Sequence, residues 1–227
     1  MVQICKGVGK LKRIFDVVVS LVGLILLSPV FLVLSVKITR DSPGGVFFRG
    51  ERVGQHGKLF RIYKFRSMIP DCEGKGKWNV GDDDDRITKV GHFLRKSKLD
   101  ELPQLINVLK GEMSMVGPRP ELQVYVDMYT PEEMPILDLK PGITDWASIT
   151  NFQQFKEFTL AEDPDAFYLN YVRQLKLKLQ LYYRYHNGFL SDLQCIFWTI
   201  YKVVSHSQKL PEKVQSIVDE YYASLEL

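Results

Sequence analysis

The sequence predicts an α+β fold: an N-terminal re-entrant membrane helix, built as helix, break and helix, precedes a mostly helical cytosolic domain with a short β-hairpin or small sheet. Three observations support this prediction. The chain has one long apolar segment at residues 14–38, two alternating stretches between residues 46 and 64, and several later stretches with helical periodicity. We divide the 227 residues into a basic flank and membrane helix (1–40), a cytosolic domain (41–205) and a peripheral C-terminal tail (206–227).

The composition is that of a folded chain, with 45% hydrophobic and 25% charged residues. A net charge of +3 is too small to indicate a nucleic-acid partner, and we find no aromatic-and-basic nucleic-acid motif. The three cysteines, Cys5, Cys72 and Cys195, are far apart and odd in number, which argues against a disulfide framework.

The apolar segment at residues 14–38 is long enough to cross a bilayer, for which about 20 residues suffice. Ser28-Pro29 lies near its middle, where proline removes a backbone hydrogen bond and bends a helix. Basic residues flank both ends, whereas a spanning bacterial helix has them mainly on one side. We therefore expect the segment to enter the membrane, break at Ser28-Pro29 and return, with both ends in the cytosol. A kinked spanning helix is the alternative.

Residues 46–48 and 58–64 alternate like strands around a glycine-containing turn, and this pattern predicts a β-hairpin. Lys64 lies between Tyr63 and Phe65 on the second strand, so its side chain points to the face opposite theirs. We expect Tyr63 and Phe65 to face the core or the membrane and Lys64 to face a site. A solvated strand lysine is the alternative.

The segment Phe93–Pro120 is the centre of the sequence, because it carries two adjacent acids, Asp100 and Glu101, directly before an amphipathic run. Ser97 precedes Asp100 by three residues, which is the spacing of a capping box. This pattern places the acids at the N-terminus of a helix, whose partial positive charge favours anions. Apolar residues then recur at helical spacing: Leu102, Leu105, Ile106 and Leu109.

Cations surround this acid pair in the sequence: Arg95, Lys96 and Lys98 precede it, and Arg119 follows between two prolines. A carboxylate pair with fixed cations at the start of a helix suits phosphate chemistry. An ordinary capped surface helix is the alternative on spacing alone.

Residues 70–86 form a polar loop that ends in the acidic run Asp82–Asp85. Carboxylate oxygens of this kind can bind a divalent cation, and a solvated loop is the alternative. The rest of the chain predicts helices at Leu122–Tyr129, Leu160–Leu181 and Phe189–Val204 and a short strand after Pro141.

Several long motifs together resemble the bacterial sugar transferases known as monotopic phosphoglycosyl transferases, in the small form with only the catalytic unit. The resemblance runs from about Lys12 to Val204. It is carried by the basic-flanked apolar helix with Ser28-Pro29, and by the motifs FFRGERVGQHGKLFRIYKFRSM, RITKVGHFLRKSKLDELPQLINVLKGEMSMVGPRP and PGITDWASI.

This resemblance implies transfer of a phosphosugar from a UDP-sugar to membrane polyprenol (undecaprenyl) phosphate. The products are polyprenol diphosphate sugar and UMP, in the first membrane step of glycoconjugate or polysaccharide assembly. It also implies a place at the bacterial inner membrane, in contact with membrane lipid, with the catalytic domain (41–205) facing the cytosol. The oligomeric state is left open.

The resemblance also implies roles for five residues. Asp100 matches the nucleophile, which forms an aspartyl phosphosugar intermediate, and Glu101 matches the catalytic acid that binds Mg2+. Lys64, Arg95 and Arg119 match basic, substrate-binding positions.

Two positions depart from the family pattern on the C-terminal side. An acid that the pattern has in a Leu-Asp-Val-Tyr-Tyr motif is replaced by Gln180, and the glycine of a Gly-Trp pair is replaced by Asp145. A nearby arginine is also missing, since the matching segment is Thr150-Asn151-Phe152-Gln153.

Two other classes remain open. A metal-dependent glycosyltransferase would use Asp82–Asp85 as an Asp-x-Asp motif and release UDP instead of UMP. A non-catalytic membrane-anchored scaffold would use the acid pair only as a helix cap.

Overall fold

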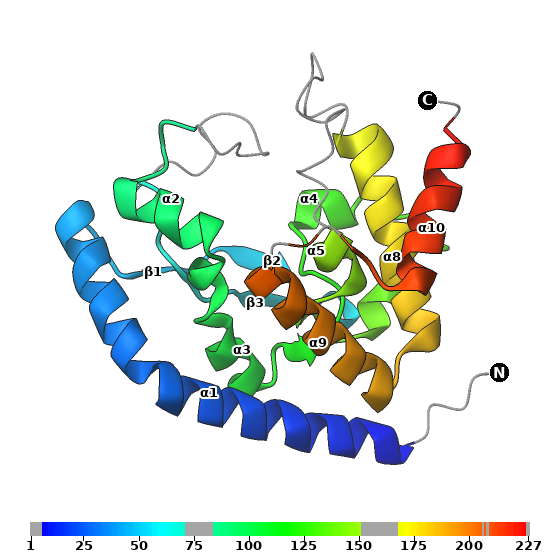
Figure 1. Cartoon of the computed structure of the whole chain (residues 1–227), viewed down its shortest axis with the longest axis horizontal. Helices are drawn as coiled ribbons and strands as arrows, with labels where there is room; N and C mark the ends of the chain where they lie inside the picture. Colours follow the sequence, from blue (N-terminus) through cyan, green and yellow to red (C-terminus); the bar gives the residue numbers. More distant parts are fainter. Residues whose placement is uncertain (1–5, 71–83, 151–167, 206, 208, 226–227) are drawn as a thin grey trace.

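The structure is a computed structural model that describes residues 6–70, 84–150, 168–205, 207 and 209–225 (Figure 1). It confirms the α+β class with a long apolar helix at the N-terminus. This helix, α1 (Lys6–Asp41), runs along one side of the molecule and curves around it. By length and composition α1 is able to cross a membrane, and only 11% of its most apolar window is buried in the protein.

The structure differs from the expected break at Ser28-Pro29, because α1 continues through Pro29 as one helix. Proline has no N–H to donate to the carbonyl of Ile25, four residues earlier. The hydroxyl of Ser28 donates to that carbonyl at 2.8 Å instead. The hydrogen bond that proline removes is thus replaced locally, and a smooth curve takes the place of a break (Figure 1).

The strands form three two-stranded sheets in the described part of the chain. The predicted hairpin is confirmed as two antiparallel pairs: β1 (Phe47–Phe48) with β4 (Lys64–Phe65), and β2 (Glu51–Val53) with β3 (Leu59–Arg61). The third pair is parallel and joins the predicted strand β6 (Gly142–Thr144) to β5 (Ser114–Val116), which the sequence did not indicate.

The remaining elements are mostly short helices. The predicted helix over residues 189–204 is confirmed as α9, whereas the prediction over residues 160–181 is seen only from Tyr168 onward, since residues 151–167 lie outside the described residues. In chain order the elements are η1 (Gln55–Gly57), α2 (Lys89–Lys96), η2 (Leu99–Glu101), α3 (Gln104–Lys110), α4 (Gln123–Val126), η3 (Met134–Asp138), α5 (Trp146–Thr150), η5 (Tyr168–Val172), α8 (Arg173–His186), α9 (Phe189–Ser205) and α10 (Glu212–Ala223).

The largest hydrophobic core lies between β5, α5, α8, α9 and α10. The C-terminal helix α10 contributes Val214, Val218 and Tyr221 to it, and Tyr221 also donates its hydroxyl to the carbonyl of Tyr171 at 2.8 Å. The segment expected as a peripheral tail therefore helps to build the core around α8.

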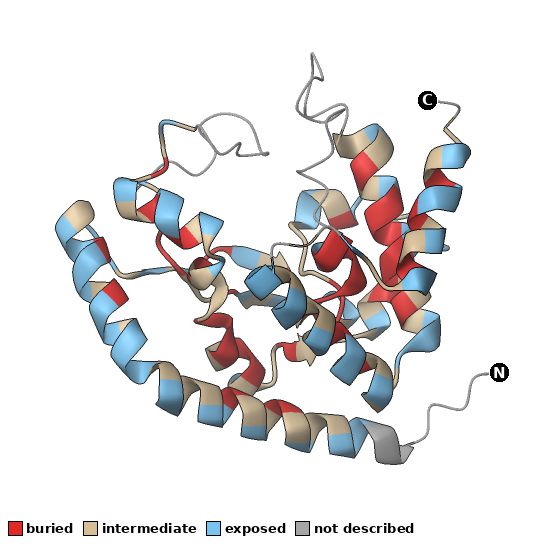
Figure 2. Cartoon of the chain, viewed as in Figure 1, coloured by how far each residue is buried: buried red, intermediate tan, exposed pale blue. Residues whose placement is uncertain are grey.

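Helix α1 is attached to the same domain near both of its ends. Near the N-terminus Arg13 donates to the carbonyls of Val108 (2.6 Å) and Leu109 (2.9 Å), at the C-terminal end of α3. At the other end Leu34 and Ile38 pack with Phe65 and Leu94. The outer side of α1 stays exposed and apolar (Figure 2), with Ile14, Ile25, Leu26, Leu32 and Val33 each more than half exposed.

Candidate active site

The two adjacent acids lie in a tight turn between two helices. Helix α2 ends at Lys96, and Lys98 then takes a left-handed conformation (φ 57°) that turns the chain into the 3-10 turn η2 with Asp100 and Glu101. The predicted capping box is wrong, because the hydroxyl of Ser97 donates to the carbonyl of Phe93 at 2.7 Å and closes α2. The acids precede the first residue of α3, Gln104, instead of lying inside its first turn.

Glu101 is the centre of an ion-pair cluster that three separate segments build. Its Oε1 accepts hydrogen bonds from Lys64 Nζ of β4 at 2.8 Å and from Arg119 Nη2 at 2.6 Å. Its Oε2 is 3.3 Å from Arg119 Nη1. The side chain of Glu101 is only 16% exposed and that of Lys64 19%, so these charges interact with little water between them.

Lys64 lies where the strand alternation placed it. Its neighbour Phe65 is 1% exposed and packs in the core, while the Lys64 side chain turns to the opposite side and reaches Glu101. Lys64 thus faces the acid pair, and its role in binding substrate stays a prediction. The prediction for Phe65 is confirmed by its burial.

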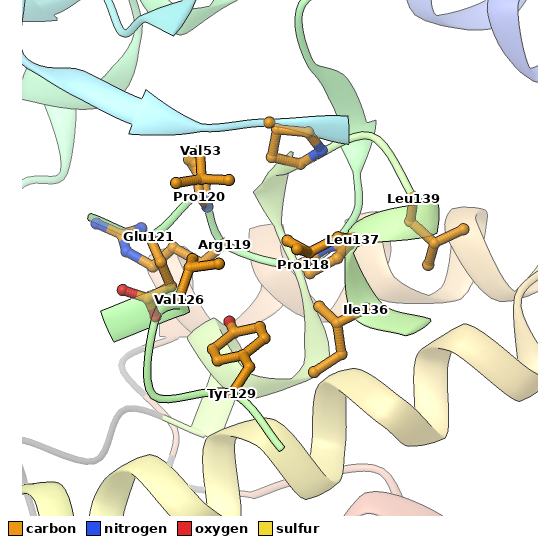
Figure 3. Close-up of a pocket in the computed structure, with 12 residues that line it drawn as sticks. Val53, Pro118, Arg119, Pro120, Glu121, Val126, Tyr129, Ile136, Leu137 and Leu139 are labelled. Atoms are coloured by element: carbon orange, nitrogen blue, oxygen red, sulfur yellow. The ribbon is translucent and has the colours of Figure 1, made fainter. Parts of the chain in front are cut away.

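Arg119 is positioned by a close approach of two backbones. Gly117, at the end of β5, lies so near Gly142 of β6 that a Cβ built on Gly142 would be 2.1 Å from the Gly117 nitrogen. Only glycine permits this contact, and the segment Pro118–Pro120 leaves the sheet directly after it. The side chains of Arg119 and Glu121 then extend in the same direction, beside the small hollow that Tyr129 and Ile136 line (Figure 3).

The charges of this cluster set the protonation of the acids. Burial alone would raise the pKa of Glu101, but the charges and hydrogen bonds of Arg119 and Lys64 outweigh it and hold that pKa well below its usual range. The Glu101 carboxylate in turn raises the pKa of Arg119, which stays cationic. Burial lowers the pKa of Lys64, an effect that the charge of Glu101 opposes.

Asp100 differs from its neighbour, because it forms no ion pair within the described part of the chain. It is 8% exposed, and burial raises its pKa above the usual aspartate range, while the charge of Lys64 opposes that rise. A poorly hydrated carboxylate beside fixed cations can act as a nucleophile toward phosphorus.

The structure does not add Arg95 to this cluster. The ion pairs that Glu101 forms among the described residues come from Lys64 and Arg119, while the charge of Arg95, on α2, acts on Asp84. Asp82 and Asp83 of the acidic run lie outside the described residues. Asp84 accepts hydrogen bonds from the Nε (2.8 Å) and Nη2 (2.6 Å) of Arg86, and these bonds lower its pKa to about 2.

The acid pair could hold a metal ion only if a substrate supplied most of the ligands. Across residues 6–70, 84–150 and the described C-terminal part, no group of three or more His, Cys, Asp or Glu side chains could hold a metal. Mg2+ needs only one or two carboxylates when phosphate oxygens complete its shell. Among the described residues Glu101 Oε2 has only the 3.3 Å contact with Arg119, so it is the oxygen that could bind such an ion.

A second layer of polar residues lies behind Arg119, and the sequence did not indicate it. Lys176 of α8 is 8% exposed and pairs with Glu121, two residues after Arg119. Asp145 is 1% exposed, and its Oδ2 accepts a hydrogen bond from the backbone N–H of Arg119 at 3.2 Å. Two polar residues four positions apart on a predicted helix, Lys176 and Gln180, were the available sequence signal for this layer. Their spacing does not show which residues of other elements they contact.

The comparisons with known proteins identify the family. The profile of the family described as bacterial sugar transferase matches residues 8–206, and the chain therefore belongs to this family. Its acid pair, Lys64 and Arg119 all lie within the matched region.

Three relatives illustrate the range of this family. The chain is 36% identical over 199 residues to the UDP-N-acetylgalactosamine-undecaprenyl-phosphate N-acetylgalactosaminephosphotransferase of Aeromonas hydrophila, covering 86% of this chain and 44% of that protein. It is 36% identical to the uncharacterized sugar transferase EpsL of Bacillus subtilis (86% and 87% covered) and 37% identical to the UDP-glucose:undecaprenyl-phosphate glucose-1-phosphate transferase of Escherichia coli (86% and 41%). The chain thus spans less than half the length of two of these three relatives.

Proposed function

We propose that this chain transfers a phosphosugar from a UDP-sugar to undecaprenyl phosphate, giving undecaprenyl diphosphate sugar and UMP. The proposal rests mainly on the different environments of the two adjacent acids, Asp100 and Glu101. Glu101 is committed to Lys64 and Arg119, whereas Asp100, beside it and poorly hydrated, keeps its carboxylate for the reaction. The names of the relatives, which include undecaprenyl-phosphate transferases for N-acetylgalactosamine, galactose and glucose phosphates, support the same reaction class.

The proposed reaction has two displacements at the same phosphorus. An Asp100 carboxylate oxygen attacks the phosphorus that carries the sugar, and the bond from this phosphorus to the oxygen that bridges to UMP breaks. UMP leaves with that oxygen, and the sugar phosphate stays on Asp100 as an acyl phosphate. A phosphate oxygen of undecaprenyl phosphate then attacks the same phosphorus and restores the free Asp100 carboxylate.

Lys64 and Arg119 contribute mainly charge and position. Phosphoryl transfer requires little acid-base chemistry, and the barrier falls when fixed cations face the oxygens that gain charge. Glu101 holds both cations next to Asp100 before substrate arrives. Mg2+, when bound through Glu101 and the diphosphate, would add neutralising charge. We also propose that Arg95 contacts the substrate, because it matches a basic, substrate-binding position of the family.

We also propose that α1 enters the inner membrane from the cytosolic side and does not cross it. Both ends of α1 contact the same domain, through Arg13 at one end and Leu34 and Ile38 at the other. The exposed side between them is apolar, as a lipid-facing surface requires. The test is a single cysteine near position 3 in a protein without Cys5, Cys72 and Cys195. Labelling of that site from outside intact cells by a membrane-impermeant reagent would contradict this topology.

The decisive experiment measures the leaving nucleotide. The purified protein is incubated with undecaprenyl phosphate, Mg2+ and a panel of UDP-sugars with N-acetylgalactosamine, galactose and glucose, and the nucleotide product is separated by chromatography. We expect UMP with at least one donor. Release of UDP would establish the glycosyltransferase alternative, and no turnover with any donor would favour the scaffold.

The Asp100→Asn variant tests the nucleophile, because the two side chains are nearly the same size. We expect turnover to disappear, and a phosphosugar to be found on Asp100 of the wild type by mass spectrometry after incubation with donor alone. Asp138→Asn is the matched control, since the carboxylate of Asp138 is 51% exposed and pairs with Arg184 outside the acid cluster. Substantial turnover by Asp100→Asn would refute the covalent mechanism.

A further inference from the structure

Asn107 of α3 is a buried polar side chain to which the proposed reaction assigns no role. It is 0% exposed, and its amide forms three hydrogen bonds. Oδ1 accepts from the backbone N–H of Tyr63 at 2.8 Å. Nδ2 donates to the carbonyl of Arg61 at 3.0 Å and to Glu112 Oε2 at 2.7 Å. These partners fix the orientation of the amide, because only its oxygen can face an N–H and only its NH2 group can face a carbonyl.

Two of these hydrogen bonds take the place of a neighbouring strand. Strand β3 ends at Arg61 and β4 begins at Lys64, so residues 62–63 lie in a gap between the two strands. In an extended chain the carbonyl of Arg61 and the N–H of Tyr63 point to the same side. The amide of Asn107 pairs with both groups, as the backbone of a partner strand would. One side chain of α3 thus holds the chain directly before Lys64.

The chain directly after Lys64 is held by the start of α2. The backbone N–H of Thr88, the N-cap of α2, donates to the carbonyl of Ser67 at 3.1 Å. Gly91 lies so near this carbonyl that a Cβ built on it would be 2.0 Å from the Ser67 oxygen. Only glycine permits so close an approach of α2 to the strand segment. Lys64 therefore lies between two fixed points of the backbone.

These two fixed points belong to the helices on either side of the acid turn. The 3-10 turn η2 with Asp100 and Glu101 lies between α2 and α3 (Figure 1). Lys64 and Glu101 are thus supported by the same pair of helices, and their side chains meet at 2.8 Å. A lysine side chain is long and flexible, so the ion pair alone does not fix the place of its ammonium group. The position of the backbone decides which part of the acid pair the ammonium can reach.

We propose that Asn107 is a positioning residue that holds Lys64 against the acid pair, through the backbone before Lys64. The strand segment cannot slide along α3 without leaving a buried N–H and a buried carbonyl unpaired, which is costly. The amide therefore keeps the distance between the acid turn and Lys64 constant. The catalytic part of this inference rests on the proposed function, whereas the dependence of the Lys64–Glu101 ion pair on Asn107 does not.

The test uses four proteins: wild type, Asn107→Leu, Lys64→Met and the double variant. Leucine has the branched shape of asparagine but forms no hydrogen bonds, and methionine is a long side chain without the charge of lysine. We expect Asn107→Leu to lower kcat/KM for UMP release at least about tenfold in wild type, because a small misplacement of a catalytic group is costly. We expect a much smaller loss in Lys64→Met. An equal loss in both backgrounds, or no loss in wild type, would refute the positioning role.

Thermal unfolding of the same four proteins tests the structural part without any turnover. Asn107→Leu leaves buried backbone groups unpaired, so the midpoint of unfolding should fall in both backgrounds. The fall should be smaller in Lys64→Met, where the ion pair that depends on Asn107 is already absent. Additive effects would refute the inference even if the wild type releases UMP. A coupled unfolding cycle with a wild type that releases no UMP would refute the proposed function and leave the positioning of Lys64 standing.

Tyr221→Phe is the control for a general loss of stability. It removes the hydrogen bond from a buried hydroxyl to the carbonyl of Tyr171, in the core around α8 and α10. We expect its midpoint of unfolding to fall while kcat/KM stays that of wild type. A loss of kcat/KM as large as that of Asn107→Leu would overturn the inference. If Asn107→Leu does not fold, Asn107→Ser replaces it with the same expected and refuting outcomes, since the smaller side chain leaves room for a water molecule at the two backbone groups.

Discussion

Replacing Glu101 by glutamine tests the central claim about the active site, namely that one buried carboxylate holds two cations. The amide has the same size but carries no charge. With its oxygen at the Oε1 position it can still accept from Lys64 and from Arg119 Nη2, but its NH2 group then faces Arg119 Nη1, a second donor. Lys64 and Arg119 would then keep their charges with no neutralising group between them. We therefore expect both lower stability and lower activity.

The expected magnitude follows from the burial of the three side chains. Removing one partner of a fully buried ion pair costs about 3–5 kcal/mol. The Lys64 side chain is 19% exposed, but that of Arg119 is 39% exposed and can regain water. We therefore discount the loss to about 2–3 kcal/mol. For a protein of this size each kcal/mol corresponds to roughly 2–4 °C, so the midpoint of unfolding should fall by about 4–12 °C.

The assay is thermal unfolding of the purified protein in detergent, followed by circular dichroism, with Asp138→Asn as the control. That substitution also changes an acid to an amide in an ion pair, but its carboxylate is 51% exposed, so a loss below about 1 kcal/mol is expected. Activity of Glu101→Gln should fall by at least about tenfold, which corresponds to ~1.4 kcal/mol of transition-state stabilisation. Glu101→Gln with the stability and activity of the control would show that the cluster does not depend on its charge.

Three further predictions use other parts of the structure. Burial raises the pKa of Asp100, so activity should be lost on the acid side at a pH above the usual aspartate range. The charge of Lys64 opposes this rise, so in Lys64→Gln the loss should occur at a still higher pH. An unchanged pH profile would contradict the role of Asp100 as the nucleophile. Arg13→Gln removes two hydrogen bonds to the end of α3 and should lower stability by about 1–3 kcal/mol in denaturant unfolding, with Arg13→Lys losing less. Replacing all four residues of Asp82–Asp85 by asparagine should leave the Mg2+ requirement of UMP release nearly unchanged; loss of that requirement would move the metal site to this loop.

Much of the active site was predictable because its signals are local. The adjacency of Asp100 and Glu101 is written in the chain, and strand alternation alone turned Lys64 away from the core side of Phe65. A prediction from a similar local pattern was wrong where the residue forms its hydrogen bond with the preceding helix instead of the following one. Ser97 has the spacing of a capping box for the following helix, but it closes α2 because the left-handed Lys98 separates the two helices.

By itself the sequence determined the apolar helix at the N-terminus, the hairpin, the acid pair and the family, since each depends on residue order and periodicity. The tertiary structure decided which charges meet: Lys64 and Arg119 stand 37 and 18 residues from Glu101 and converge only through packing. It also decided that α1 continues past Pro29 without a break, because the Ser28 hydroxyl bonds the carbonyl that proline leaves free. Likewise, only packing brings Asp145 and Gln180, 35 residues apart, into contact. Contacts of this kind depend on how separate elements pack, and no local pattern of residues encodes that packing.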